Sequence, residues 1–573
     1  MLLTLALAAA TVAAQSETTP SPAAPLPELL DHAALEARLA QLAAEHPEHV
    51  TALRLGRSRG DRAITALRVA AGEVRDGRPA LLVVANVDGD HVWTSGLALW
   101  QVERLLERAD DPRVAELLAT TTLYVVPRVA PDAAEARFAA PLADGLATGA
   151  AADLDRDGRV GEDGPSDVDG DGYVTWMRVP DPEGGWRADP TDARGSVRAD
   201  AARGEASEFA LVREGRDTDG DELASEDPPH DARVDENFAA LWREHTPSAG
   251  RFPMDEPEAR ALADFVIARE DVAAVLTYGR LDNLVQSPDS VDVDAPPVKR
   301  VPRPGWLKPD AERLAELARR RKQAGPAASA GEGGFEGSFP LWAYDHRGLW
   351  SVAIRPWDIP LDAKKAEPEP AEGEETAAEA EAAPKTKSKA EEAKPGDDAK
   401  RLVWCENEGE LARFVPWTAF EHPELGPVEV GGWRPYARVE PPDALAGELA
   451  EAELTFLLEL AEALPRVRVA EASARALGAG LVEVRCALSN DALLPLTSAS
   501  AERTETQRGV RVRLALPEGA ELVAGRAEER VEALAGAGGR AELRWLVRGP
   551  VDGGSLEVVS DHAGTARVAL EVK

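Results

Sequence analysis

The sequence predicts an α/β fold, with a mixed sheet and helices on both of its faces, followed by an all-β sandwich domain. Two short apolar runs, 80–85 (ALLVVA) and 122–126 (TLYVV), have the length and continuity of strands buried inside a sheet. Helical patterns alternate with these runs, which indicates that helices pack on the sheet. After about Arg466 the pattern changes to strand-like runs separated by glycine-rich turns, as in a β-sandwich.

The spacing of apolar residues places the individual elements along the chain. We expect helices at residues 28–44, 95–106 and 259–268. We expect strands of the first sheet at residues 50–55, 63–69, 80–85, 122–126 and 273–278. The sandwich strands are expected at residues 480–487, 510–516, 541–547 and 555–559.

Composition divides the chain into segments. The apolar run Leu2–Val12 and the small residues after it predict a secretory signal peptide, and therefore a secreted, periplasmic or extracellular protein. A buried or trimmed N-terminus is the alternative. The expected segments are a signal peptide at 1–14, a linker at 15–27, an α/β domain at 28–445 and a sandwich at 466–573.

Two inserts interrupt the α/β domain. Residues 153–231 are rich in Asp and Gly, and residues 364–400 consist almost wholly of Ala, Glu, Lys and Pro. Because the second insert has no large apolar residues to bury, we expect it to be disordered, with a solvated helix as the alternative.

The formal net charge of −37 argues against nucleic acids and anionic membranes as partners, because both bind through basic patches. It also suggests bound cations. No apolar run has the length of a membrane span. The two cysteines, Cys405 and Cys486, match no metal-binding spacing, so they form either a disulfide or two free buried thiols.

Short segments spread over residues 55–432 follow an order that is known from one family. They are 55–58 (LGRS), 85–91 (ANVDGDH), 130–132 (APD), 234–238 (VDENF), 255–261 (DEPEARA), 339–357 and 414–432. In this order they resemble the landmarks of the zinc carboxypeptidases (carboxypeptidase A-like), in a bacterial secreted branch with a β-sandwich after the peptidase domain. The resemblance implies a carboxypeptidase-like fold, a zinc cofactor and proteolysis.

The metal site of that family is degenerate here. Catalytic zinc needs three protein ligands and one open position for water. Asp88 and His91 stand where the family has the His and Glu of its first motif, and the third ligand, a His, is expected near Leu276–Gly279. No histidine occurs between His245 and His346. Asp282 is a further candidate ligand, and the alternative is that Asp88 and His91 bond to one another or to water.

The base and the substrate clamp also differ from the family pattern. Arg355 follows the expected strand 349–353, where the resemblance places the catalytic glutamate, and a guanidinium cannot deprotonate water. Arg355 could instead pair with Asp88, Asp235 or Glu236. Asp235 and Glu236 themselves stand at the substrate-binding Asn-Arg position, which inverts its charge. Arg137 is the candidate for the oxyanion arginine, with a surface arginine as the alternative.

The first insert contains three stretches with the spacing of calcium loops. In such loops, alternating Asp residues project carboxylates inward and Gly allows the tight turn. The candidate calcium ligands are Asp153, Asp155, Asp157, Asp167, Asp169, Asp171, Asp217, Asp219 and Asp221. A solvated acidic loop is the alternative. Tyr173, Trp176 and Trp186 flank these stretches, and we expect them to anchor the insert to the core, with a ligand-contacting surface as the alternative.

Three functions fit these observations. The first is a catalytically inactive pseudo-peptidase whose cleft binds a peptide, a glycan or a protein partner. The second is an active metallocarboxypeptidase with a metal site rearranged around Asp88 and His91. The third is a calcium-stabilised surface binding protein in which the acidic loops and the sandwich carry the function.

Overall fold

A computed structural model describes most of the chain: residues 26–72, 77–147, 158, 163–217, 224–225, 232–286, 290–291, 305–326, 329–364 and 394–572. The expected signal peptide at 1–14 and nearly all of the expected linker lie outside these residues. Most of the second insert, residues 365–393, also lies outside them, but a helix, α8 (Asp397–Glu408), begins within its predicted bounds.

The first sheet has six strands and is mixed, as predicted. Its strand order is β1 (Val50–Arg57), β2 (Ala63–Val69), β4 (Thr122–Val126), β3 (Ala80–Ala85), β9 (Val272–Tyr278) and β12 (Trp350–Ile354). The first three are antiparallel neighbours, whereas β4, β3, β9 and β12 run parallel. The apolar runs predicted at 80–85 and 122–126 form the central strands β3 and β4, which are buried at every position.

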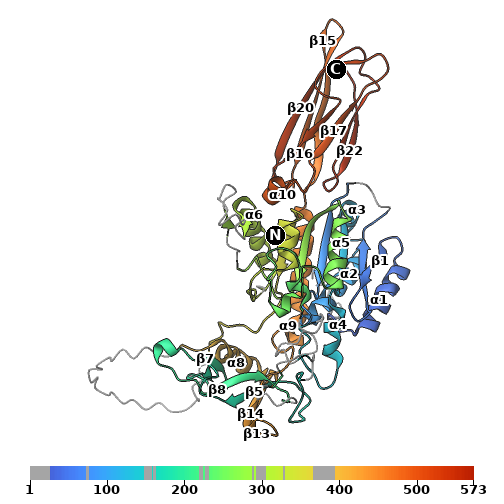
Figure 1. Cartoon of the computed structure of the whole chain (residues 1–573). Coiled ribbons are helices and arrows are strands. Elements are labelled where there is room, and N and C mark those ends of the chain that lie inside the picture. The colour runs from blue at the N-terminus through green and yellow to red at the C-terminus, as the bar shows by residue number, and fades with distance from the viewer. Residues whose placement is uncertain are drawn as a thin grey trace, which may run out of the picture.

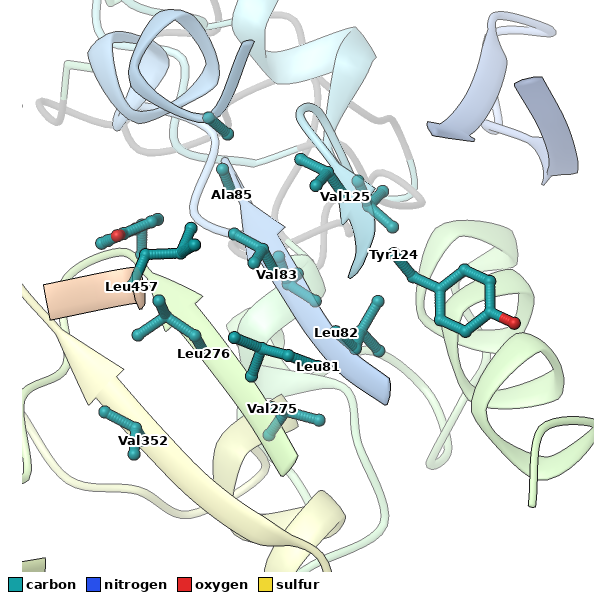
Figure 2. Packing of buried hydrophobic residues seen from close by; sticks show 14 of the residues in the cluster. Leu81, Leu82, Val83, Ala85, Tyr124, Val125, Val275, Leu276, Val352 and Leu457 are labelled. Atoms are coloured by element: carbon teal, nitrogen blue, oxygen red, sulfur yellow. The ribbon is translucent and has the colours of Figure 1, made fainter. Parts of the chain in front are cut away.

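Helices cover both faces of this sheet. They are α1 (His32–Glu45), α2 (Val92–Glu107), α3 (Pro112–Thr120), α5 (Pro257–Ile267), α6 (Lys308–Ala324), α7 (Phe339–Asp345) and α9 (Asp443–Ala463). Local signals explain some of their ends: the Asp111 carboxylate accepts from the first free backbone N–H groups of α3, and Pro112 occupies its first turn. The core packs side chains of β3, β4, β9 and β12 against one another and against Leu457 of α9 (Figure 2).

A second six-stranded sheet is antiparallel and was not predicted. Its order is β13 (Phe414–His422), β14 (Gly426–Trp433), β5 (Trp176–Pro180), β8 (Phe209–Arg213), β6 (Trp186–Ala188) and β7 (Ser196–Arg198). Four of these strands lie inside the Asp- and Gly-rich insert. The insert is therefore part of a sheet, and it lies at the opposite end of the molecule from the C-terminal domain (Figure 1).

The C-terminal domain is an antiparallel sandwich, as predicted. One sheet has the order β15 (Val467–Gly478), β16 (Leu481–Asn490), β20 (Gly539–Arg548) and β18 (Glu521–Ala524). The other has the order β19 (Glu528–Val531), β17 (Val510–Ala515), β21 (Ser555–Val559) and β22 (Thr565–Ala569). Trp545, Val512 and Val484 belong to the separate apolar core between them.

The remaining elements are short connections. They are α4 (Pro131–Ala134), α10 (Ala499–Thr504), β10 (Ser290–Val291), β11 (Trp306–Leu307) and the 3₁₀ turns η1 (Glu135–Phe138), η2 (Ala201–Arg203), η3 (Val234–Glu236), η4 (Pro247–Ala249) and η5 (Leu411–Arg413). Cys405 and Cys486 are buried free thiols, which is one of the two predicted alternatives. Within the described ranges, no helix combines the length and the hydropathy of a membrane span.

Candidate functional site

A cleft of about 720 Å³ opens where the carboxyl ends of β3, β9 and β12 face the second sheet. Residues that follow the parallel strands, among them Asp88, Arg280 and Arg355, form its floor. Side chains of the second sheet, among them Trp176 and Trp433, form the opposite wall. In α/β sheets, the carboxyl ends of neighbouring parallel strands are a common place for a binding site.

The centre of the floor is an ion pair between Asp88 and Arg280. Strands β3 and β9 pair with Ala85 opposite Tyr278, so the residues after them meet at one edge of the sheet. Arg280 donates from its backbone N to Asp88 Oδ2 at 2.9 Å and from Nε to Oδ1 at 3.1 Å. The side chains of Asp88 and Arg280 are only 6% and 13% exposed. Both carboxylate oxygens of Asp88 therefore have partners from Arg280.

Two backbone features hold Asp88 in this position. Asn86 has a φ of +50°, and its Nδ2 donates to the carbonyl oxygens of Asp88 and Gly89 at 3.0 and 3.2 Å. Asn tolerates this left-handed conformation better than most residues. A Cβ at Gly279 would lie 2.5 Å from Asp88 Oδ2, so only glycine permits the close approach.

Asp235 and Glu236 lie beside this pair, on η3. Asp235 is buried and accepts a hydrogen bond from the Phe339 N–H at 2.8 Å. Arg280 Nη2 lies 3.4 Å from the Asp235 carbonyl oxygen and 3.9 Å from Glu236 Oε1. Burial, followed by the charge of Asp88, raises the pKa of Asp235 well above its ordinary value. Burial alone would lower the pKa of Arg280, but Asp88, Asp235 and Glu236 together raise it.

Of the two residues, only Glu236 lines the cleft, and the Ser248 Oγ–H donates to its carboxylate at 2.6 Å. The position of Asp235 therefore does not allow it to contact a substrate in the cleft directly.

His91 belongs to a second pair on the floor. Its Nδ1 lies 2.7 Å from Asp90 Oδ1, and its Nε2 is buried without a partner. Although burial opposes it, His91 holds the pKa of Asp90 below its ordinary value. The side chains of Asp88 and His91 thus have different partners, and the alternative in which these side chains bond to one another is wrong.

Arg355 has partners other than those considered from the sequence. Its guanidinium pairs with Glu332 at 3.1 Å and with Asp358 at 3.0 Å, instead of with Asp88, Asp235 or Glu236. The reason is local: the Ser329 N–H donates to the Arg355 carbonyl oxygen, which brings the segment carrying Glu332 alongside.

Two other candidate site residues, Arg137 and Asp282, do not line the cleft. Arg137 donates from Nε and Nη2 to the carboxylate of Glu440 at 2.6 and 3.0 Å, and it does not line the cleft. Asp282 accepts from the backbone N–H groups of Leu284 and Val285, which occupies its Oδ1. Its Oδ2 lies 3.4 Å from the Arg355 N–H. Asp282 is therefore a loop-capping carboxylate, and the Arg137 position matches the surface-arginine alternative.

The described residues do not fit a zinc ion at Asp88 and His91. Zinc needs three protein ligands that converge on one point. Across the described ranges, one set of three acidic, His or Cys side chains is close enough to hold a metal, and it contains neither residue. Arg280 already occupies both oxygens of Asp88.

That one set, which we call the acidic triad, consists of Asp167, Asp169 and Glu214. Glu214 was missed by the sequence analysis. It is buried, and its carboxylate accepts from the N–H groups of Val168 and Thr175, both at 2.7 Å. Burial raises its pKa, and Asp169 adds repulsion. Of the other expected calcium ligands, Asp171 and Asp217 are not in the triad, and Asp153, Asp155, Asp157, Asp219 and Asp221 lie outside the described residues.

The wall opposite the floor, which we call the aromatic wall, consists of Trp176, Trp186, Trp417 and Trp433. Guanidinium groups lie over three of these rings: Arg213 at 4.8 Å from the Trp176 centroid, Arg198 at 4.1 Å from Trp186 and Arg178 at 4.1 Å from Trp417. Trp176 and Trp186, for which an anchor to the core and a ligand-contacting surface were the two predicted alternatives, line the cleft.

Comparisons with known proteins identify both parts of the chain. The sequence profile described as "Zinc carboxypeptidase" matches residues 35–376, more than half of the 573 residues. A second profile, a domain of unknown function (DUF8731), matches residues 466–571, which is the sandwich. No curated protein matches the chain.

Solved structures show the same likeness at low identity. The thrombin activatable fibrinolysis inhibitor is 14% identical over 59% of this chain and 69% of its own, with a TM-score of 0.35. Carboxypeptidase A from Helicoverpa armigera is 13% identical over 59% of this chain and 66% of its own, with a TM-score of 0.36. A metallo-carboxypeptidase from Burkholderia cenocepacia is 13% identical over 56% and 58%, with a TM-score of 0.29. Because these scores are low, the family assignment rests on the sequence profile.

Proposed function

The chain belongs to the zinc carboxypeptidase family, and from this premise we propose that it is a pseudo-peptidase, which has lost zinc-dependent hydrolysis and uses its cleft to bind a ligand. The proposal includes replacement of the residues that carry the family's metal, base and substrate clamp.

The observation that carries this proposal is the bond between Asp88 and Arg280. By the resemblance, Asp88 stands at the first zinc-ligand position. A guanidinium stays charged at any physiological pH, so Arg280 supplies from within the chain the positive charge that a metal would supply to Asp88, Asp235 and Glu236. A zinc ion at Asp88 would have to displace a buried arginine and leave its charge without a partner.

Glu332, the carboxylate beside Arg355, is also a poor candidate for a catalytic base. Glu332 lies in the cleft beside Arg355 and Arg438, at 3.1 and 3.0 Å. Burial alone would raise the pKa of Glu332, but Arg438 and Arg355 lower it. A carboxylate with a lowered pKa is a weaker base. Glu332 therefore takes a proton from water less readily than a catalytic base must.

The test is release of the C-terminal residue from hippuryl-phenylalanine and hippuryl-arginine by the full-length protein supplied with Zn²⁺. We expect no release above that of buffer. Release that is removed by a chelator and by Asp88→Ala, but retained in the control Arg113→Ala, at an exposed arginine outside the cleft, would establish instead the active metallocarboxypeptidase with a rearranged site.

The acidic triad supports a second role, in which Ca²⁺ stabilises the insert. Calcium prefers several hard oxygen ligands, and the triad brings together three carboxylates. Repulsion among them would be relieved by a bound cation. This proposal concerns the stability of the second sheet and is compatible with the pseudo-peptidase.

Secretion is a separate proposal that rests on the predicted signal peptide at residues 1–14. Fusing residues 1–27 to a reporter enzyme that is active only after export tests it. We expect export of the fusion, and retention when Leu5 and Leu7 are replaced by Arg.

A further inference from the structure

The tryptophans of this chain are distributed unevenly. Eight of the thirteen are buried. Of the other five, which are half-buried, four form the aromatic wall and only Trp242 lies elsewhere. Large aromatic side chains left partly in water on one side of a concave site are typical of ligand contact, because their apolar surface gains free energy only when a ligand covers it.

The aromatic wall is built to hold its rings in place. Trp176, Trp186, Trp417 and Trp433 come from four different strands, β5, β6, β13 and β14. A guanidinium covers one face of three of these indoles, which fixes their orientation.

Gly432 lies beside two of these rings. A Cβ at this position would be in van der Waals contact, at 3.4 Å, with atoms of both Trp176 and Trp417, and the φ of +102° favours glycine. Glycine at this position therefore leaves the two indoles close to the backbone of β14, with no side chain between them.

The floor opposite the aromatic wall offers an unpaired hydrogen-bonding atom. His91 is 3% exposed, and its Nε2 has no partner although the residue lines the cleft. A buried polar atom without a partner is unfavourable, so a ligand with a group that can hydrogen-bond to Nε2 is favoured here.

The formal charges that line the cleft balance in number, which is compatible with a neutral ligand. Six carboxylates and six guanidiniums line it. Arg280 and Arg355 on the floor are already bonded to Asp88 and Glu332. An anionic peptide terminus would have to displace these pairs, whereas a neutral ligand with many hydroxyl groups could use the donors and acceptors on either side.

We propose that the cleft binds a neutral oligosaccharide, with C–H faces of its sugar rings on the aromatic wall and a hydroxyl group hydrogen-bonded to His91 Nε2. Sugar rings combine apolar C–H faces with a rim of hydroxyls, which matches one aromatic wall and one polar floor. A volume of about 720 Å³ can hold a short segment of such a chain. This inference rests on the proposed function, because an active peptidase would use the same floor for a peptide.

The test is titration of the full-length protein with neutral tetrasaccharides of N-acetylglucosamine, glucose and xylose, followed by tryptophan fluorescence and calorimetry. We expect saturable binding of at least one of them and an affinity loss of at least tenfold in Trp186→Ala. The matched control Trp242→Ala removes a half-buried tryptophan outside the cleft and should leave the affinity unchanged. His91→Phe should weaken binding more than His91→Gln, which retains a hydrogen-bonding group, and circular dichroism checks that each variant is folded.

Absence of saturable binding for all three sugars would overturn the inference, as would equal losses in Trp186→Ala and Trp242→Ala. Binding of tetra-alanine in place of the sugars, sensitive to Trp186→Ala, would establish a peptide cleft instead. A zinc-free, inactive protein that binds no sugar refutes this inference alone. Zinc-dependent release of a C-terminal residue refutes the proposed function, whatever the sugars do.

Discussion

Two acidic clusters in this molecule differ in what offsets the repulsion between their carboxylates. At the floor of the cleft, Arg280 bonds directly to the buried carboxylate of Asp88, and its charge also acts on the buried carboxylate of Asp235. In the acidic triad, the carboxylates of Asp169 and Glu214 accept from backbone N–H groups, and none of the described ion pairs includes them. The first cluster carries its own cation, and the second has only dipoles. The comparison predicts that the cleft excludes metal ions and that the triad takes one up.

The largest expected change in unfolding free energy is that of Arg280→Ala. Removing one partner of a buried ion pair leaves the other charge uncompensated, which typically costs about 3–5 kcal/mol of unfolding free energy. Urea unfolding measures this cost. The control Arg243→Ala removes a half-exposed arginine 3.8 Å from Glu336 and should change the unfolding free energy by less than about 0.5 kcal/mol. Equal effects of the two variants would contradict the role given to Arg280.

The next largest expected effect is a pH dependence of the unfolding free energy that originates at Asp235. Its pKa is raised in the folded state, so the folded protein holds this proton more tightly than the unfolded chain does. The stabilisation is complete below the unfolded pKa, near 4, and is lost as the pH rises through the folded pKa. Each unit by which the pKa is raised contributes about 1.4 kcal/mol.

Asp235→Asn should remove this loss, because an amide retains the acceptor for the Phe339 N–H and cannot ionise. Unfolding free energies measured between pH 4 and pH 8 should therefore fall less steeply in the variant than in the wild type. Asp264→Asn, at an exposed position on α5, is the control that should leave the slope unchanged. Identical slopes for the wild type and Asp235→Asn would be incompatible with a raised pKa.

A smaller effect is expected when Ca²⁺ is added. Binding to the folded state alone stabilises a protein by about 2.7 kcal/mol at a hundredfold excess over Kd. Thermal unfolding with Ca²⁺ and with a chelator should differ in the wild type, and Asp169→Asn should reduce the difference. Asp171→Asn is a matched control on the same turn but outside the triad. If both variants respond to Ca²⁺ as the wild type does, the triad is not the site.

Much of the fold could be predicted from the sequence, because its signals are local. The runs at 80–85 and 122–126 became the central strands β3 and β4, and the change of pattern near Arg466 coincides with the start of the sandwich. The second sheet was missed because β6 and β7 have three residues each, and because β5 pairs with β14, a strand that lies far along the chain.

The sequence predicted several residues that line the cleft, but not the contacts that they make there. Asp88, His91 and Glu236 do line the cleft, but the partner of Asp88 is Arg280, which was not considered. That contact depends on the register between β3 and β9 and on the missing side chain of Gly279. Glu214 reaches Asp169 through the pairing of β5 with β8, at a sequence separation that no local motif covers.

The central claim is that Arg280 takes the place of a metal at Asp88, and the zinc content of the protein tests it most directly. Elemental mass spectrometry of full-length protein purified without chelators, before and after dialysis against Zn²⁺, gives the number of zinc ions per chain. We expect far less than one, and no change in Asp88→Ala or His91→Ala. One zinc per chain in the wild type, lost in both variants, would contradict the claim and would restore a metal centre to this cleft.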